Sequence, residues 1–145
     1  MKTQTILLAA CAALQLGFSA LASAEPLAII VSSKNANTSI SISNDLAEKL
    51  FLGKLDAFPD GSTAVPLDLP KGPVREEFYL KVTGKNPSQV KAYWAKQVFT
   101  GSGQPPKEIE SSTDLVDLIA KNPNLVGYVE KSKVNSSVKV LYSLP

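Results

Sequence analysis

Histidine is absent from the 145-residue sequence, and cysteine occurs once, at Cys11. Without histidine the chain can form no Ser-His-Asp triad, no imidazole general base and no histidine metal site. Removal of an amino-terminal segment that includes Cys11 would also leave no thiol for a disulfide or a metal ion. These absences exclude most of the usual catalytic centres. We therefore expect no enzyme activity, no metal site and no cofactor.

Neither sign of charge is in clear excess. The chain has 15 lysines and arginines against 13 aspartates and glutamates. Surfaces that bind nucleic acids or anionic membranes carry clusters of basic residues, and the sequence contains no such cluster. We therefore expect no nucleic-acid partner.

The first 24 residues have the pattern of a secretory signal peptide. Lys2 supplies a positive charge, residues 6–21 are almost wholly apolar, and Ala22-Ser23-Ala24 is a small-x-small cleavage signal. The alternative is a membrane anchor, but the apolar run falls short of the roughly 20 residues that span a bilayer. We predict cleavage after Ala24, a periplasmic location without stable membrane insertion, and one domain over residues 25–145.

Apolar periodicity and turn residues predict strands that alternate with helices. We expect strands over residues 26–33, 63–69, 125–129 and 138–142, and helices that begin near Asn44, Pro73, Pro87 and Ser112. Val65, Leu67 and Leu69 should share one face of the second strand, and Val90, Trp94 and Val98 one stripe of the third helix. We place Trp94 in the core rather than against a ligand. This order of elements predicts an α/β layer fold.

The start of the second predicted helix has the features of an anion site. A strand, a glycine-bearing turn and a helix start follow one another, which leaves backbone N–H groups and the positive end of the helix dipole facing a ligand. Beside Gly72, Lys71 can add a point charge and Arg75 a bidentate guanidinium. The alternative is that Arg75 pairs with Glu76, Glu77 or nearby acids on a solvated face. Lys71 projects from a turn and Arg75 from a first helical turn, so neither side chain needs to be buried.

Two other stretches are candidates for the same anion site. One is the glycine-rich loop of Thr100, Gly101, Ser102, Gly103 and Gln104. Its N–H groups and hydroxyls can form an anion-binding nest, or else the first glycine only caps the preceding helix. The other is Ser32, which follows the first strand, where ligand groups often lie in α/β sheets. The alternative for this serine is a plain polar loop.

Several stretches occur in the order found in the phosphate-binding periplasmic proteins of ABC transporters. They are Asp45–Lys54 (DLAEKLFLGK), Phe58–Gly61 (FPDG), Arg75–Phe78 (REEF), Tyr93-Trp94, Phe99–Pro106 (FTGSGQPP) and Asn124–Glu130 (NLVGYVE). The chain most closely resembles the small, single-lobe members of this family. The resemblance covers nearly all of residues 25–145.

This resemblance implies both a fold and a function. The fold is a single lobe of the type II periplasmic-binding-protein-like class, α/β, with a mixed sheet flanked by about four helices. The function is binding of phosphate or a similar small oxyanion without catalysis, with an ABC permease or a membrane sensor as the protein partner. The chain departs from the family because Lys71-Gly72-Pro73-Val74 stands where relatives have a Ser-Gly-Thr type of helix start. A second hypothesis is therefore a ligand-free module for protein interaction or sensing in the cell envelope.

Overall fold

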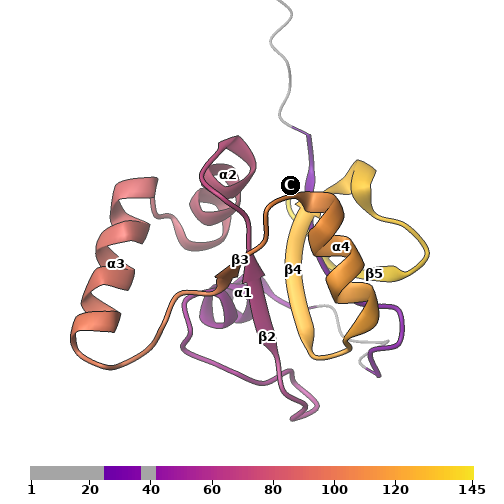
Figure 1. Ribbon diagram of the computed structural model, residues 1–145, viewed down its shortest axis with the longest axis horizontal. Coiled ribbons are helices and arrows are strands. Elements are labelled where there is room, and N and C mark those ends of the chain that lie inside the picture. The colour runs from indigo at the N-terminus through magenta and orange to yellow at the C-terminus, as the bar shows by residue number, and fades with distance from the viewer. Residues whose placement is uncertain (1–24, 37–41) are drawn as a thin grey trace, which may run out of the picture.

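The computed structural model describes residues 25–36 and 42–145, and these form an α/β domain (Figure 1). The predicted signal peptide over residues 1–24 lies outside the described residues. In chain order the elements are β1 (Leu27–Ser32), α1 (Asn44–Phe51), β2 (Val65–Asp68), α2 (Pro73–Thr83), α3 (Pro87–Phe99), β3 (Lys107–Glu108), α4 (Ser112–Lys121), β4 (Leu125–Glu130), the 3₁₀ turn η1 (Lys131–Lys133) and β5 (Val138–Ser143). Among these residues no helix is long and apolar enough to cross a membrane.

The strands form one mixed sheet in the order β3-β2-β4-β1-β5. β2 runs parallel to both β3 and β4, whereas β1 runs antiparallel to β4 and β5. The carboxyl ends of β2, β3 and β4 therefore lie at one edge of the sheet, and the carboxyl end of β1 lies at the opposite edge. This arrangement confirms the predicted α/β class and the mixed sheet.

The core lies on both faces of the sheet. On one face, Phe78 of α2 stacks on Tyr128 of β4 with ring centroids 3.7 Å apart, and Phe51 of α1 meets Phe78 edge to face at 4.7 Å. Gly127 precedes Tyr128, so its α-carbon faces the other side, where Leu115 of α4 packs against it. α1 and α2 therefore cover one face, and α4 covers the other (Figure 1).

Local signals set the helix ends as the sequence predicts. The Ser43 side chain accepts a hydrogen bond from the Leu46 N–H at the start of α1, and the Ser111 side chain caps α4 in the same way. α2 begins at Pro73 and ends at Thr83, and its C-cap is Gly84, whose φ of 69° is readily available to glycine.

The predictions for the apolar face of β2 and the apolar stripe of α3 are only partly correct. Val65 is 43% exposed because it borders an open cleft beside the segment that leads into β3. Val98 is 45% exposed although Trp94, one turn earlier, is buried as predicted. α3 packs on α2 and, through Tyr93 and Trp94, on the segment that follows α1, and these contacts leave Val98 half-exposed. The sequence also gave no sign of β3, which has two residues.

The contact between α4 and β4 generates the first prediction. A β-carbon added at Gly127 would lie 2.7 Å from Leu115 Cδ2 and 2.8 Å from Ile119 Cδ1, and both side chains are fully buried. Gly127→Ala should therefore lower the free energy of unfolding by about 1–3 kcal/mol through overpacking. Urea denaturation followed by circular dichroism measures this change.

Gly103→Ala is the matched control. A β-carbon at Gly103 meets its nearest atom at 4.0 Å, and its backbone is not in the left-handed region. Its free energy of unfolding should stay within about 0.5 kcal/mol of the unmodified protein. Equal losses in the two variants would show that the packing of α4 on Gly127 is not as tight as described.

Candidate functional site

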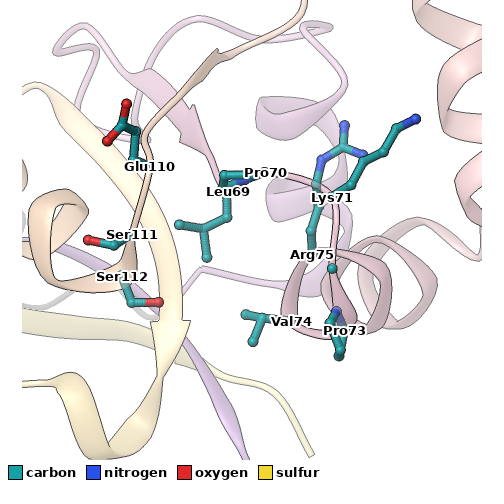
Figure 2. A pocket seen from close by; sticks show the side chains of 10 residues that line it. Leu69, Pro70, Lys71, Pro73, Val74, Arg75, Glu110, Ser111 and Ser112 are labelled. Atoms are coloured by element: carbon teal, nitrogen blue, oxygen red, sulfur yellow. The ribbon is translucent and has the colours of Figure 1, made fainter.

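The starts of two helices meet at a cleft of about 280 Å³ (Figure 2). We call it the first cleft. Its lining comes from the end of β2, the start of α2 and the start of α4: Leu69, Pro70, Lys71, Gly72, Pro73, Val74, Arg75, Glu110, Ser111 and Ser112. The predicted anion residues Lys71, Gly72 and Arg75 all lie in this lining.

The sheet explains why these helix starts converge. α2 follows β2 and α4 follows β3, and these two strands are parallel neighbours. Both helices therefore begin at the same edge of the sheet, with their positive dipole ends directed to one place. At α2 the N-cap is Gly72, no side chain caps the helix, and the first intrahelical bond runs from the Glu76 N–H to the Gly72 carbonyl. The N–H groups of Val74 and Arg75 precede that bond, as anion-binding amides at a helix start do.

The side chains of the first cleft are partly apolar. Figure 2 shows Leu69 and Val74 on the side that faces α4, while Lys71 and Arg75 extend away from Ser111 and Ser112. The Ser112 hydroxyl donates to Glu130 Oε2 at 2.7 Å. The sequence predicted only that a helix begins near Ser112. It could not place Ser111 and Ser112 in a site because β3, which brings α4 to this edge, is too short to recognise.

The Arg75 side chain forms an ion pair with the buried carboxylate of Asp68. Its Nε lies 3.2 Å from Asp68 Oδ2, and its side chain is only 15% exposed. Arg75 therefore pairs with a nearby acid, as the alternative holds, but this acid is Asp68 and not Glu76 or Glu77, and the pair is largely buried instead of lying on a solvated face. Asp68 points inward from the end of β2, and its side chain is 1% exposed. A buried charge of this kind is stable only with a close partner, which explains why the arginine turns toward it.

Asp68 accepts four hydrogen bonds in all. Besides Arg75, Oδ2 accepts from the Tyr79 hydroxyl at 2.9 Å, and Oδ1 accepts from the Tyr128 hydroxyl at 2.5 Å and from the Leu69 N–H at 2.8 Å. These donors come from the strand-to-helix connection, from α2 and from β4. The carboxylate therefore fixes the position of the α2 start relative to the sheet.

The pKa values of Tyr79, Tyr128 and Arg75, the side chains that contact Asp68, are all raised. Burial raises the pKa of Tyr79 and of Tyr128, and the negative charge of Asp68 raises both further. For Arg75, burial alone would lower the pKa of the guanidinium, but the charge of Asp68 opposes burial and the net direction is upward. The folded state therefore favours the charged form of Arg75 and the neutral form of both phenols.

A second cleft, of about 580 Å³, adjoins the first. Lys71 and Arg75 line both clefts. The remaining lining of the second cleft comes from α2, the start and middle of α3, and the β3 region: Glu76, Pro87, Ser88, Lys91, Trp94, Pro105 and Glu108. The two clefts thus meet at the start of α2.

The loop of residues 100–104 lies elsewhere. It follows the carboxyl end of α3, whereas the amino end of α3 borders the second cleft, and the 13 residues between span about 20 Å. The N–H groups of Thr100, Gly101 and Ser102 donate to the carbonyls of Lys96, Val98 and Gln97. These three amides cap α3, as the alternative interpretation holds, and Gln104 lines a third cleft that shares Trp94 and Pro105 with the second. The structure does not bring this loop together with Lys71 and Gly72.

Ser32 also lies away from the helix starts. Its side chain is buried and donates to the Ala120 carbonyl at 3.1 Å. In the sheet register, Val31 pairs with Val126, which itself pairs with Pro66 near the beginning of β2. Ser32 therefore sits at the opposite edge from Lys71, because β1 runs antiparallel to its neighbours.

No protein-family model and no curated protein sequence matches the chain. Solved structures do match it. One is a protein from Clostridium perfringens described as a phosphate ABC transporter substrate-binding protein with bound phosphate. It superposes with a TM-score of 0.61 and 17% sequence identity, and the match covers 80% of this chain and 44% of the Clostridium chain. An ABC-type phosphate transport receptor from Vibrio cholerae matches with a TM-score of 0.61 and 16% identity, over 80% of this chain and 45% of the receptor. PstS from Borrelia burgdorferi matches with a TM-score of 0.60 and 10% identity, over 81% of this chain and 47% of PstS.

These likenesses show the fold. The chain has the architecture of a single lobe of a periplasmic-binding-protein-like fold, and the resemblance to phosphate ABC transporter substrate-binding proteins is confirmed at that level. The chain spans less than half the length of each of these three structures.

The Asp68–Arg75 pair generates the second prediction. Arg75→Ala should lower the free energy of unfolding by about 2–4 kcal/mol, because it leaves a buried carboxylate without its cation. Lys49→Ala is the control, since Lys49 pairs with Asp45 at 2.7 Å but both side chains are well exposed. That change should cost less than about 1 kcal/mol. Urea denaturation of both variants tests the contrast, and equal small losses would mean that Arg75 is not held as described.

The raised tyrosine pKa values generate the third prediction. A tyrosine in an unfolded chain has a pKa of about 10, so above that pH the unfolded state releases protons that folded Tyr79 and Tyr128 retain. Their contribution to stability is therefore complete below about pH 10 and falls as the pH rises further. Urea midpoints measured between about pH 8 and 11 should fall less steeply for Tyr128→Phe than for the unmodified protein. A slope that is the same for Tyr128→Phe and for the unmodified protein would contradict the burial of this hydroxyl beside Asp68.

Proposed function

We propose that this chain binds a small oxyanion such as phosphate in the first cleft and catalyses no reaction on it. The observation that carries the proposal is the convergence of the α2 and α4 starts on one cleft that also contains Lys71. Backbone N–H groups at a helix start and a positive dipole end are a general means of binding anions. Two such starts at one cleft favour a negative charge more than either alone.

Each group has a distinct role in this proposal. The N–H groups of Val74 and Arg75 donate to the anion, and the Ser112 hydroxyl turns from Glu130 to donate as well. Lys71, which is exposed, supplies a mobile positive charge at the mouth of the cleft. The Arg75 side chain is committed to Asp68 and acts mainly by fixing the helix start. Pro73 has no N–H to offer, but at the first helical position that group is not needed by the helix.

The structural neighbours support this choice of ligand. One of them is described as holding phosphate, and another is described as a phosphate transport receptor. By analogy, we propose that the chain acts in the periplasm after removal of residues 1–24. An ABC permease or a membrane sensor would then be its protein partner.

The fourth prediction concerns binding itself. Isothermal titration at low salt should detect heat with phosphate or sulfate, and the same anions should raise the unfolding temperature. At a concentration about ten times the dissociation constant, the added stability is about 1.4 kcal/mol. The same concentrations of chloride, at matched ionic strength, should have no such effect. No heat and no thermal shift at millimolar phosphate and sulfate would refute the proposal and favour the ligand-free interaction module.

Paired variants locate the site. Ser112→Asp places a carboxylate inside the first cleft and should abolish binding, whereas Thr113→Asp adds the same charge to the same helical turn outside the lining. Lys71→Gln should weaken binding about tenfold, as expected for loss of one charge-assisted hydrogen bond. Lys121→Gln, at the far end of α4, is its control. Binding that survives Ser112→Asp and Lys71→Gln would place the anion elsewhere.

A further inference from the structure

The second cleft is too large to serve only a simple oxyanion. Its volume is about 580 Å³, roughly twice that of the first cleft. Cavities of 300–1,000 Å³ typically hold small organic molecules. Lys71 and Arg75 line both clefts and extend away from Ser111 and Ser112, toward a common side of the α2 start (Figure 2). A molecule bound at the helix starts can therefore continue past these two side chains into the second cleft.

The walls of the second cleft are of two kinds. Pro87, Trp94 and Pro105 provide apolar surface, and Trp94 is only 6% exposed. The charged groups are Lys71, Arg75 and Lys91 against Glu76 and Glu108. Such a mixture suits an organic group that is partly apolar and partly charged.

Each charged side chain that lines the second cleft can be considered with the group that neutralises it. The charge of Arg75 is matched by Asp68. Lys71 lines both clefts, and in the proposed function its charge is matched by the bound oxyanion. The remainder of the second cleft then has two carboxylates, Glu76 and Glu108, against one ammonium, Lys91, and in the part of the chain that the structure describes none of these three forms an ion pair. An excess of negative charge favours a positively charged group on the ligand.

We propose that the ligand is a small phosphonate or phosphate monoester whose organic arm carries an amine. Its phosphoryl group lies at the starts of α2 and α4, its arm passes Lys71 and Arg75 and lies along Trp94, and its ammonium group is bound by Glu76 and Glu108. This inference rests on the proposed function and narrows the class of ligand for the same site.

The fluorescence of Trp94 can be used to measure where the ligand binds. Trp94 is the single tryptophan of the chain, and it lines the second cleft but not the first. Trp94 also lines the cleft that contains Gln104, so tryptophan fluorescence distinguishes binding in these two clefts from binding confined to the first cleft, while calorimetry reports on binding anywhere. The three probes are inorganic phosphate, ethylphosphonate, and 2-aminoethylphosphonate, which differs from ethylphosphonate by its amine alone.

We expect 2-aminoethylphosphonate to bind at least tenfold more tightly than ethylphosphonate and to change the Trp94 emission. In the double variant Glu76→Gln, Glu108→Gln the ratio of the two affinities should fall to near one. These side chains are exposed and the substitutions keep their shape, so the unfolding temperature without ligand should change little. Asp117→Asn, an exposed change in α4 outside both clefts, should keep the tenfold ratio.

The possible failures are distinguishable. Binding of inorganic phosphate with equal affinities for the two phosphonates, or with no change in Trp94 emission, would overturn this inference and leave the proposed function intact. An affinity ratio that persists in the double variant would also overturn it, because the amine would then be recognised elsewhere. Absence of binding by all three probes would overturn both the inference and the proposed function.

Discussion

The Asp68 carboxylate is the constraint on which the rest of this structure depends. It is buried at the end of β2, and a buried charge is tolerated only when its oxygens are paired. Arg75 and Tyr79 reach it from α2, Tyr128 reaches it from β4, and the backbone of Leu69 completes the set. A single side chain thus joins the central strand pair to the helix that follows. Any shift of α2 along the sheet would leave at least one of these polar groups without its partner.

The aromatic core and the carboxylate support each other. Tyr128 stacks on Phe78 with its ring while its hydroxyl donates to Asp68. Tyr79 lies on the same helix, and the Arg75 guanidinium sits over its ring at 5.1 Å. The same residues therefore bury apolar area and satisfy the charge, so that packing and hydrogen bonding select one position for the α2 start.

That position gives the two clefts their chemistry. With Arg75 committed to Asp68, the start of α2 is presented through its backbone N–H groups and through Lys71. The α4 start reaches the same place only because β3 pairs with β2, although β3 has just two residues. A domain with the fold of one lobe, spanning less than half the length of its structural neighbours, thereby places two helix starts and two cation-bearing side chains along one continuous surface.

The sequence by itself determined the features that depend on neighbours along the chain. The helix starts near Asn44, Pro73 and Ser112 depend on local side chains, so they could be predicted. The apolar stripe of α3 was only partly correct, because exposure of Val98 depends on which elements pack against the helix. The tertiary structure alone decided the partner of Arg75. This partner, Asp68, is seven residues from Arg75 in the sequence, and Tyr128, which also donates to Asp68, is sixty residues from Asp68. The tertiary structure also separated Ser32 from Lys71, since strand direction in a sheet follows from long-range pairing and not from local pattern. For the same reason the sequence could not show that the residues Thr100–Gln104 do not line the first cleft, or that Ser112 does.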